Sequence, residues 1–294
     1  FDFDIDIKLD KKNFKIDFLN YQKKIKSSSQ IKVRGNLNEK KYISLNDISI
    51  LENKNKIKIS NLILNKKNSI IRVDKARFNY VDDENKQNDF LIKRINENNY
   101  YKKGKLFNAN SLITKITESD DEKNNNVFEN NFNLNLYLDQ VYLDKKYFIK
   151  NLKGELLIQD NNVQNAKISA IYENKEKVNF TIYKKDNGVK ITTLNSTWAK
   201  PLVSRYKFIK GFEEGYLDFY SSKNNGVSNS VLIVDNFKVK EVPVLAKLLA
   251  LASLQGIADL LTGEGIRFTD FEMKFSNKDK LMTIEELYAI GPAI

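Results

Sequence analysis

Apolar and polar residues alternate along much of this chain, beginning at its first residue. In the opening segment FDFDIDIKLD, every odd position is apolar and every even position is charged. Because successive side chains of a β-strand point to opposite faces, this period of two predicts a strand with one apolar face. Short polar stretches separate further segments of this kind, at residues 14–19, 31–37, 42–50, 57–64 and 70–80. Strands so closely spaced predict an antiparallel β meander over residues 1–82.

Residues 83–131 interrupt the alternation. The acidic stretch DDEN at 82–85 and the polar run at 118–126 are typical of loops, whereas residues 90–96 are compatible with a short helix. We therefore predict a polar connector or insertion that can contain one short helix.

The alternation returns at residue 132 and predicts β-hairpins. The clearest hairpin has strands at 178–183 and 189–194 around Asp186-Asn187-Gly188. Asn-Gly favours positive φ, so we expect a tight primed turn there. Further strands are predicted at 134–143, 148–158, 166–172, 216–220 and 231–240.

One long helix is predicted, over residues 242–261. Pro243 stands in its first turn and Gly263 just beyond its end, as is typical of helix boundaries. The helix is apolar on both sides, so it must be buried in a core or lie against lipid. Its main stripe consists of Leu245, Leu248, Leu249, Ala252, Gly256 and Leu260.

This helix has about the length needed to cross a bilayer, about 30 Å. However, Lys247, Gln255 and Asp259 are polar interior positions, and charges at the bilayer centre are costly. We predict that the helix plugs or caps a sheet. An interfacial helix in contact with lipid and a transmembrane span are the alternatives.

The amino-acid composition excludes catalytic and metal sites that depend on His or Cys. The 294 residues include no His and no Cys, which excludes Ser-His-Asp and Cys-His catalysis, disulfides, and metal sites built on these ligands. Acidic pairs at 82–83, 120–122, 213–214 and 285–286 lie in polar contexts and are expected to be solvated. We predict no enzyme, no cofactor and no metal site. A glycan hydrolase that uses two carboxylates is the remaining enzymatic alternative.

The positive charge does not indicate nucleic-acid binding. The formal net charge is +11, but the lysines are spread in alternation with apolar residues. That distribution is typical of the solvated face of strands, and no known nucleic-acid-binding motif accompanies it. We expect no nucleic-acid partner.

The C-terminal segment 235–294 resembles a known family. Its stretches DNFKV at 235–239, VPVLAKLLALASLQGIADLLTGEGIRF at 242–268 and YAIGPA at 288–293 are similar to the C-terminal region of AsmA-like proteins of the YhdP type, which are related to TamB. GKLFNA at 104–109 and GFEEGYL at 211–217 resemble the family more weakly, and Asn108 stands where the family pattern has Asp. The firm resemblance covers less than a third of the chain.

This resemblance implies a fragment of a bridge-like lipid transfer protein in a Gram-negative cell envelope. Such proteins are periplasmic and anchored in the inner membrane, here by a segment outside this sequence. The implied fold is mainly β: a long antiparallel sheet, curled or twisted, with an apolar concave face (a β-groove), plus one apolar α-helix near the C-terminus. The groove carries phospholipid acyl chains between the membranes and takes part in outer-membrane biogenesis.

On this interpretation, the alternating apolar residues face the groove. The candidates are Phe1, Phe3, Ile5, Ile7, Val178, Phe180, Ile182, Val189 and Ile191. A closed sandwich core would show the same alternation. The alternative function is a scaffold for outer-membrane protein assembly, with an outer-membrane protein as partner bound by strand addition at a sheet edge.

Overall fold

The computed structural model is mainly β, with 70% of its residues in strands. It describes residues 1–37, 42–113, 130–160, 162–205, 211–240, 265–279 and 281–292. The elements in chain order are β1 (Asp2–Leu9), β2 (Lys15–Ile16), η1 (Asp17–Leu19), β3 (Tyr21–Gln22), β4 (Ser29–Leu37), β5 (Ile43–Glu52), β6 (Asn55–Leu64), β7 (Ile70–Val81), β8 (Gln87–Arg94), β9 (Asn99–Asn108), β10 (Phe132–Tyr142), β11 (Phe148–Gln159), β12 (Asn162–Tyr172), β13 (Lys177–Lys184), β14 (Lys190–Ser196), α2 (Lys200–Val203), β15 (Phe212–Asn224), β16 (Val227–Val239), β17 (Ile266–Lys278) and β18 (Leu281–Ile290).

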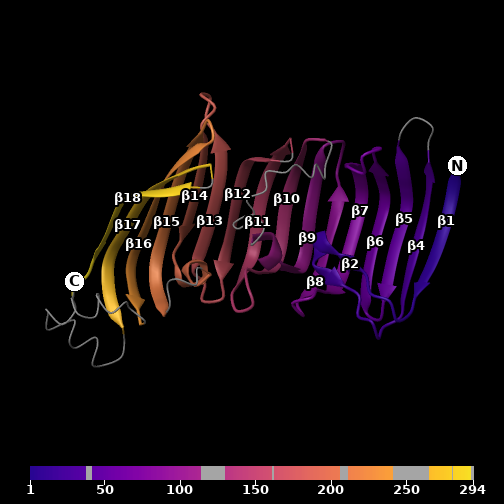
Figure 1. Ribbon diagram of the computed structural model, residues 1–294, viewed down its shortest axis with the longest axis horizontal. Coiled ribbons are helices and arrows are strands. Elements are labelled where there is room, and N and C mark those ends of the chain that lie inside the picture. Colours follow the sequence, from indigo (N-terminus) through magenta and orange to yellow (C-terminus); the bar gives the residue numbers. More distant parts are fainter. Residues whose placement is uncertain are drawn as a thin grey trace. The chain divides into compact units, whose positions relative to one another are not determined.

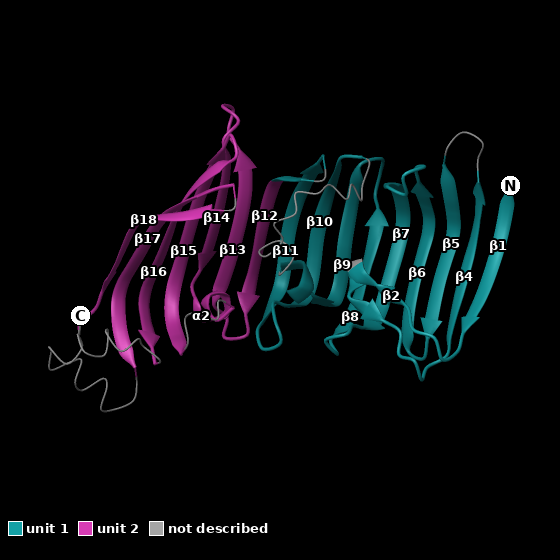
Figure 2. Cartoon of the chain, viewed as in Figure 1, with its two compact units in different colours: residues 1–164 teal, residues 165–294 magenta. Residues whose placement is uncertain are grey.

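The strands form one 16-stranded sheet and one small two-stranded sheet (Figure 1). In the large sheet the hydrogen-bonded order follows the chain from β1 through β4 to β18, and β2 pairs with β3 separately. The chain divides into two compact units, residues 1–164 and 165–294 (Figure 2). The strand bounds confirm most of the strands predicted from the alternation, with differences of a few residues at their ends.

The segment 14–19 departs from the predicted meander. It forms the two-residue strand β2 and the 3-10 turn η1, and β2 pairs with β3 instead of joining the large sheet. The reason is burial of the aromatic side chain that follows: Tyr21 is completely buried against Tyr80 of β7, with 5.7 Å between the ring centroids. The insertion between β1 and β4 thus packs on the large sheet.

The stretch 83–131 contains the two strands β8 and β9. The prediction of a short helix at residues 90–96 is therefore wrong. Residues 87–94 form β8, which pairs with β7 on one side and β9 on the other. Phe90 is buried and pairs with Phe78, while exposed Lys93 pairs with exposed Lys75. Apolar and polar residues of this segment therefore alternate with the period of a strand. Backbone hydrogen bonds to β7 and β9 hold it in the extended conformation.

The sheet is mixed, whereas the sequence predicted an antiparallel one. Strand β10 runs parallel to β9, with Lys102 opposite Leu136 and Gly104 opposite Leu138. The other strand pairings described are antiparallel. Parallel neighbours require a connection that returns along the strand length. Residues 109–131 provide that connection, which no short turn could make.

The turn after β13 also differs from the expected primed type. In the described turn, Gly188 has a φ of 85°, and Asn187 is not among the residues with positive φ. The Gly188 N–H donates to the Lys185 carbonyl at 2.9 Å. This is a type I turn completed by a glycine in the left-handed region, an arrangement that also matches the twist of a hairpin.

Candidate functional site

Cross-strand register aligns the apolar residues of residues 1–164 into continuous rows. Directly paired residues have their side chains on the same face of a sheet. One row consists of Ile7, Ile31, Ile50, Ile57, Phe78 and Phe90; the next consists of Ile5, Val33, Ile48, Ile59, Ala76 and Ile92. We call the face that carries these two rows the unit 1 apolar face.

The opposite face of the same strands is charged. The row that alternates with the two apolar rows contains Asp6, Lys32, Ser49, Lys58 and Arg77. Lys32 Nζ lies 3.3 Å from an Asp6 carboxylate oxygen. Unit 1 is therefore amphipathic across its thickness, which explains how so many lysines fit a regular sheet.

Accessibility of the unit 1 apolar face changes from strand to strand. Ile5 and Ile7 on β1 are 43% and 42% exposed, whereas Ile57, Phe78 and Phe90 are 2%, 4% and 2% exposed. A sealed core would leave none of these side chains accessible. The row that begins at Ile7 is thus open at β1 and covered at β6 to β8, whereas Ile59 and Ile92 of the second row are half-buried.

The insertion between β1 and β4 provides part of that cover. Tyr80, which shares its face with Phe78, donates from its hydroxyl to the Leu19 carbonyl at 2.8 Å. Tyr21 also donates to the carboxylate of Glu52, a residue only 3% exposed at the end of β5. Burial raises the pKa of both tyrosines. The insertion is therefore held on the apolar face by rings and by buried hydrogen bonds.

Buried charges in this insertion are satisfied. The completely buried Lys23 donates to the carbonyls of Lys12 at 2.8 Å, Lys24 at 3.0 Å and Ser27. Burial disfavours the charged form of Glu52, but hydrogen bonds from Ser27 and Tyr21, among others, lower its pKa overall. A network of this kind is structural, because each charged group already has its partners.

Residues 165–294 carry an equivalent set of apolar rows. The central row consists of Ile168, Phe180, Leu194, Phe219, Leu232, Met273 and Leu287. At one end of these strands, Phe212, Phe237 and Phe268 are stacked with centroid spacings of 5.1 and 5.0 Å, and they cluster with buried Val203 of α2. We call this surface the unit 2 apolar face.

The nine candidate residues divide between the two units. Phe3, Ile5 and Ile7 lie on the unit 1 apolar face beside the 86% exposed Phe1. Val178, Phe180 and Ile182 lie on the unit 2 apolar face.

Ile191 and Val189 differ from the other seven candidates. Ile191 pairs with Tyr183, one position out of step with Ile182, so it faces the other side of the sheet, and it is 1% exposed. Val189 lies in the turn before β14, where its carbonyl accepts a hydrogen bond from the Lys185 N–H at 2.9 Å.

A lysine occupies the unit 1 apolar face and was missed by the sequence pattern. Lys102 continues the row of Ile92 and pairs with Leu136 on its other side. Its Nζ lies 3.0 Å from the centroid of the Phe107 ring and 4.3 Å from that of Phe90. Burial lowers the pKa of Lys102 well below its usual range. The residue as a whole is half-buried, and its ammonium lies against the two ring faces.

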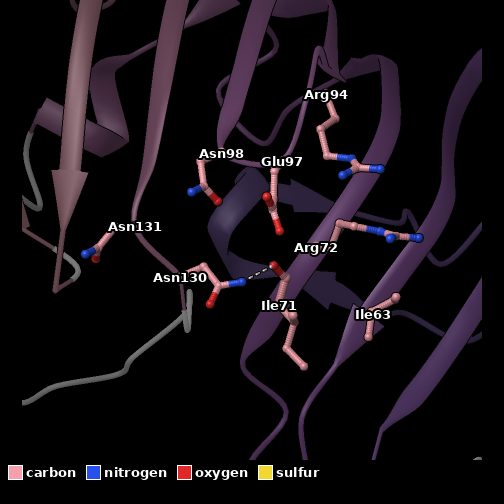
Figure 3. A pocket seen from close by; sticks show the side chains of 8 residues that line it. All are labelled: Ile63, Ile71, Arg72, Arg94, Glu97, Asn98, Asn130 and Asn131. Carbon is pink, nitrogen blue, oxygen red and sulfur yellow. Dashed lines mark hydrogen bonds between the residues drawn. The ribbon is translucent and has the colours of Figure 1, made fainter.

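A pocket of about 500 Å³ lies at the ends of β7 and β8. Two guanidinium groups reach toward it, but Asp74 Oδ1 lies 2.7 Å from Arg94 Nε and 3.4 Å from Arg72 Nε. Figure 3 shows the lining side chains and the hydrogen bond that Asn130 donates to the Ile71 carbonyl at 3.1 Å. Because Asp74 and Glu97 balance the two arginines, the pocket has no excess charge for a ligand. Its lining is Ile63, Ile71, Arg72, Arg94, Glu97, Asn98, Asn130 and Asn131.

The acidic pair at 82–83 is not wholly solvated as expected. Asp82 is 5% exposed, and its carboxylate accepts hydrogen bonds from Asn88 Nδ2 at 3.0 Å and Asn108 Nδ2 at 2.8 Å. The backbone N–H groups of Glu84 and Lys86 donate to it as well. This carboxylate joins the β7–β8 turn to the end of β9, so its role is structural.

The predicted cap helix lies outside the described residues, including Leu245, Leu248, Leu249, Ala252, Gly256 and Leu260. None of the helices in the described ranges combines the length and the apolar character that crossing a bilayer requires. In the same ranges, no group of His, Cys, Asp and Glu side chains is arranged to hold a metal ion.

No family model, curated protein or solved structure matches this chain. The geometry of the two apolar faces and the resemblance of residues 235–294 are therefore the two observations on which a function can be based.

Proposed function

We propose that this chain is a segment of an AsmA-like envelope protein that binds phospholipid acyl chains along its apolar sheet faces and conducts them between the inner and outer membranes. Its parent protein is periplasmic and anchored in the inner membrane by residues outside this sequence. The observation that carries the proposal is the unit 1 apolar face, whose rows continue over successive strands while Ile5 and Ile7 stay 43% and 42% exposed.

The dimensions of a row suit an acyl chain. Neighbouring strands lie about 4.8 Å apart, so the row over β1, β4, β5, β6 and β7 extends about 19 Å. One leaflet of a bilayer core about 30 Å thick accounts for about 15 Å of acyl chain. A row is therefore long enough to shelter a single lipid tail.

Binding of this kind needs no catalytic group. Each CH₂ removed from water contributes about 0.8 kcal/mol, and an apolar surface does not depend on the position of one residue. The charged opposite face keeps the sheet in water. On this proposal each unit's apolar face lines an open, concave groove of its own, and the insertion that contains Tyr21 covers one part of the groove of unit 1.

Lipid analysis of a pair of charge variants tests the proposal. Ile50 is half-buried on the unit 1 apolar face, and its neighbour Ser49 lies on the charged face. We expect native mass spectrometry of the purified protein to show bound phospholipid. Ile50→Asp should weaken lipid binding by about a hundredfold, because a charge among acyl chains costs about 3 kcal/mol. Ser49→Asp should leave it unchanged. Lipid-free wild-type protein after exposure to phospholipid vesicles would reject the proposal.

A second candidate function is supported by the edge strand β18. Leu281, Ile284, Leu287 and Ile290 are 68%, 53%, 56% and 52% exposed there, and no strand of the described ranges pairs with the outer edge of β18. An accessible apolar edge can add a strand from a partner. This arrangement suits a scaffold for an outer-membrane protein. Photocrosslinkers at positions 284 and 287 that capture a β-barrel protein, together with absent lipid, would favour this function over the first.

A further inference from the structure

Lys102, which is half-buried, differs from the buried Lys23 of the same unit. Lys23 has three carbonyl acceptors for its ammonium. Within the described residues, the ammonium of Lys102 is in contact with the faces of Phe90 and Phe107, and no carboxylate pairs with it. Desolvation alone accounts for its lowered pKa, with no compensating acidic group in these ranges. Among the described residues, the contacts of this charge on the apolar surface are therefore the two ring faces.

The surroundings of Lys102 keep space for its ammonium. Gly104 is on the same face two residues further along β9, and a Cβ there would lie 2.5 Å from Phe90 Cβ and 2.4 Å from the Asp89 carbonyl oxygen. The missing side chain lets the Phe90 ring lie beside the strand, where it meets Phe107 edge-on at 5.3 Å between centroids. The ammonium therefore lies over the rings of Phe90 and Phe107, on the apolar face.

We propose that Lys102 Nζ binds the carboxylate of a long-chain fatty acid whose tail lies along the row of Ile92 on the unit 1 apolar face. This inference rests on the proposed function, since the tail uses the same rows. A carboxylate is favoured over a phosphate head group because Lys102 offers one positive charge, flanked by the rings of Phe90 and Phe107. A phosphodiester would bring a second substituent into that space, whereas a carboxylate oxygen can meet the ammonium in a compact, charge-assisted hydrogen bond.

Binding assays with three amphiphiles of equal chain length test the inference. The probes are hexadecanoate, hexadecanol and a hexadecanoyl lysophosphatidate, titrated into wild-type protein and the variants Lys102→Met, Lys102→Arg and Lys103→Met. Lys103 is the matched control, because it is exposed on the opposite face of the same strand. We expect wild-type protein to prefer hexadecanoate over hexadecanol and lysophosphatidate by about tenfold. Lys102→Met should lose this preference, and Lys102→Arg and Lys103→Met should keep it.

Labelling of the wild-type protein gives a test that does not depend on the folding of a variant. Acetylation of Lys102, followed by peptide mass spectrometry, should slow about tenfold when hexadecanoate is present, while acetylation of Lys103 stays unchanged. Hexadecanol should give no such protection.

The possible failures are distinguishable. If none of the three amphiphiles binds, both the proposed function and this inference are rejected. If hexadecanol binds as well as hexadecanoate and Lys102 labelling is unprotected, apolar binding stands and the role of Lys102 is overturned. Preference for lysophosphatidate, lost in Lys102→Met, would overturn the assignment of a carboxylate.

Discussion

The ring of Tyr21 meets the ring of Tyr80 edge-on at 86°, with 5.7 Å between centroids. These residues come from different sheets: Tyr21 belongs to β3 of the small sheet, and Tyr80 to β7 of the large one. Both are almost completely inaccessible, at 0% and 2% exposure. The contact is therefore the point at which the insertion closes over the unit 1 apolar face.

Loss of this contact should uncover the apolar face. We expect Tyr21→Ala to lower the free energy of unfolding by about 3 kcal/mol, the usual cost of removing a buried aromatic ring, and to increase binding of a hydrophobic dye to the folded protein. Urea unfolding and dye fluorescence measure the two effects. Gln22→Ala, at an exposed position beside Tyr21, should change neither. Normal dye binding in folded Tyr21→Ala would contradict the role of the insertion as a cover.

Glu52 should make stability depend on pH in the acidic range. Its pKa in the folded protein is below the ordinary value of 4.5, so its stabilising contribution is present above that value and is lost as pH falls through the lower, folded pKa. We expect Glu52→Gln to be less stable than wild type at pH 7 by about 1–2 kcal/mol, from weakened hydrogen bonds to a charged group. The difference should shrink as the pH falls below 4.5.

Urea midpoints measured across this pH range check the prediction. Glu155→Gln, at an exposed position of β11, is the control and should follow the wild-type profile. A stability difference between Glu52→Gln and wild type that stays constant at every pH would show that Glu52 acts through packing alone.

Lys102 should reduce stability in the absence of a ligand. Because its folded pKa is lowered from the ordinary value of 10.5, folding is opposed wherever the unfolded chain carries the charge, which is below that value. We expect Lys102→Met to raise the free energy of unfolding at pH 7 by about 1 kcal/mol, a small figure because Lys102 is only half-buried. The gain should vanish above pH 10.5. A loss of stability in Lys102→Met at pH 7 would mean that the ammonium supports the fold.

Gly104 should not tolerate a side chain. A Cβ at this position would lie 2.4 Å from the Asp89 carbonyl oxygen and 2.7 Å from Phe90 Cα, and both are backbone atoms that cannot move alone. We expect Gly104→Ala to cost about 1–3 kcal/mol, the usual range for overpacking, and to displace the Phe90 ring from Lys102. Chemical denaturation and the acetylation rate of Lys102 report these effects. Lys103→Ala, on the opposite face, should be close to wild type.

Much of the fold could be predicted from the sequence because a strand has a period of two. The alternation in residues 1–10 shows which side chains share a face without any knowledge of the neighbouring strand, since the pleat alone places them. The same holds for Val178, Phe180 and Ile182, which the register later aligns with Leu194 and its row. Which side chains of a strand share a face depends on neighbouring residues in the chain alone, so the sequence is enough to predict it.

Tertiary structure decided which strands are neighbours and what each face contains. Lys102 lies in the polar-looking run YYKKGK, and only its pairing with Ile92 and Leu136 places it on the apolar face. The burial of Tyr21 against Tyr80 likewise removed residues 14–19 from the meander. Residues far apart in the chain set both outcomes, because the free energy of burying a side chain depends on the partner it meets, and alternation carries no information about that partner.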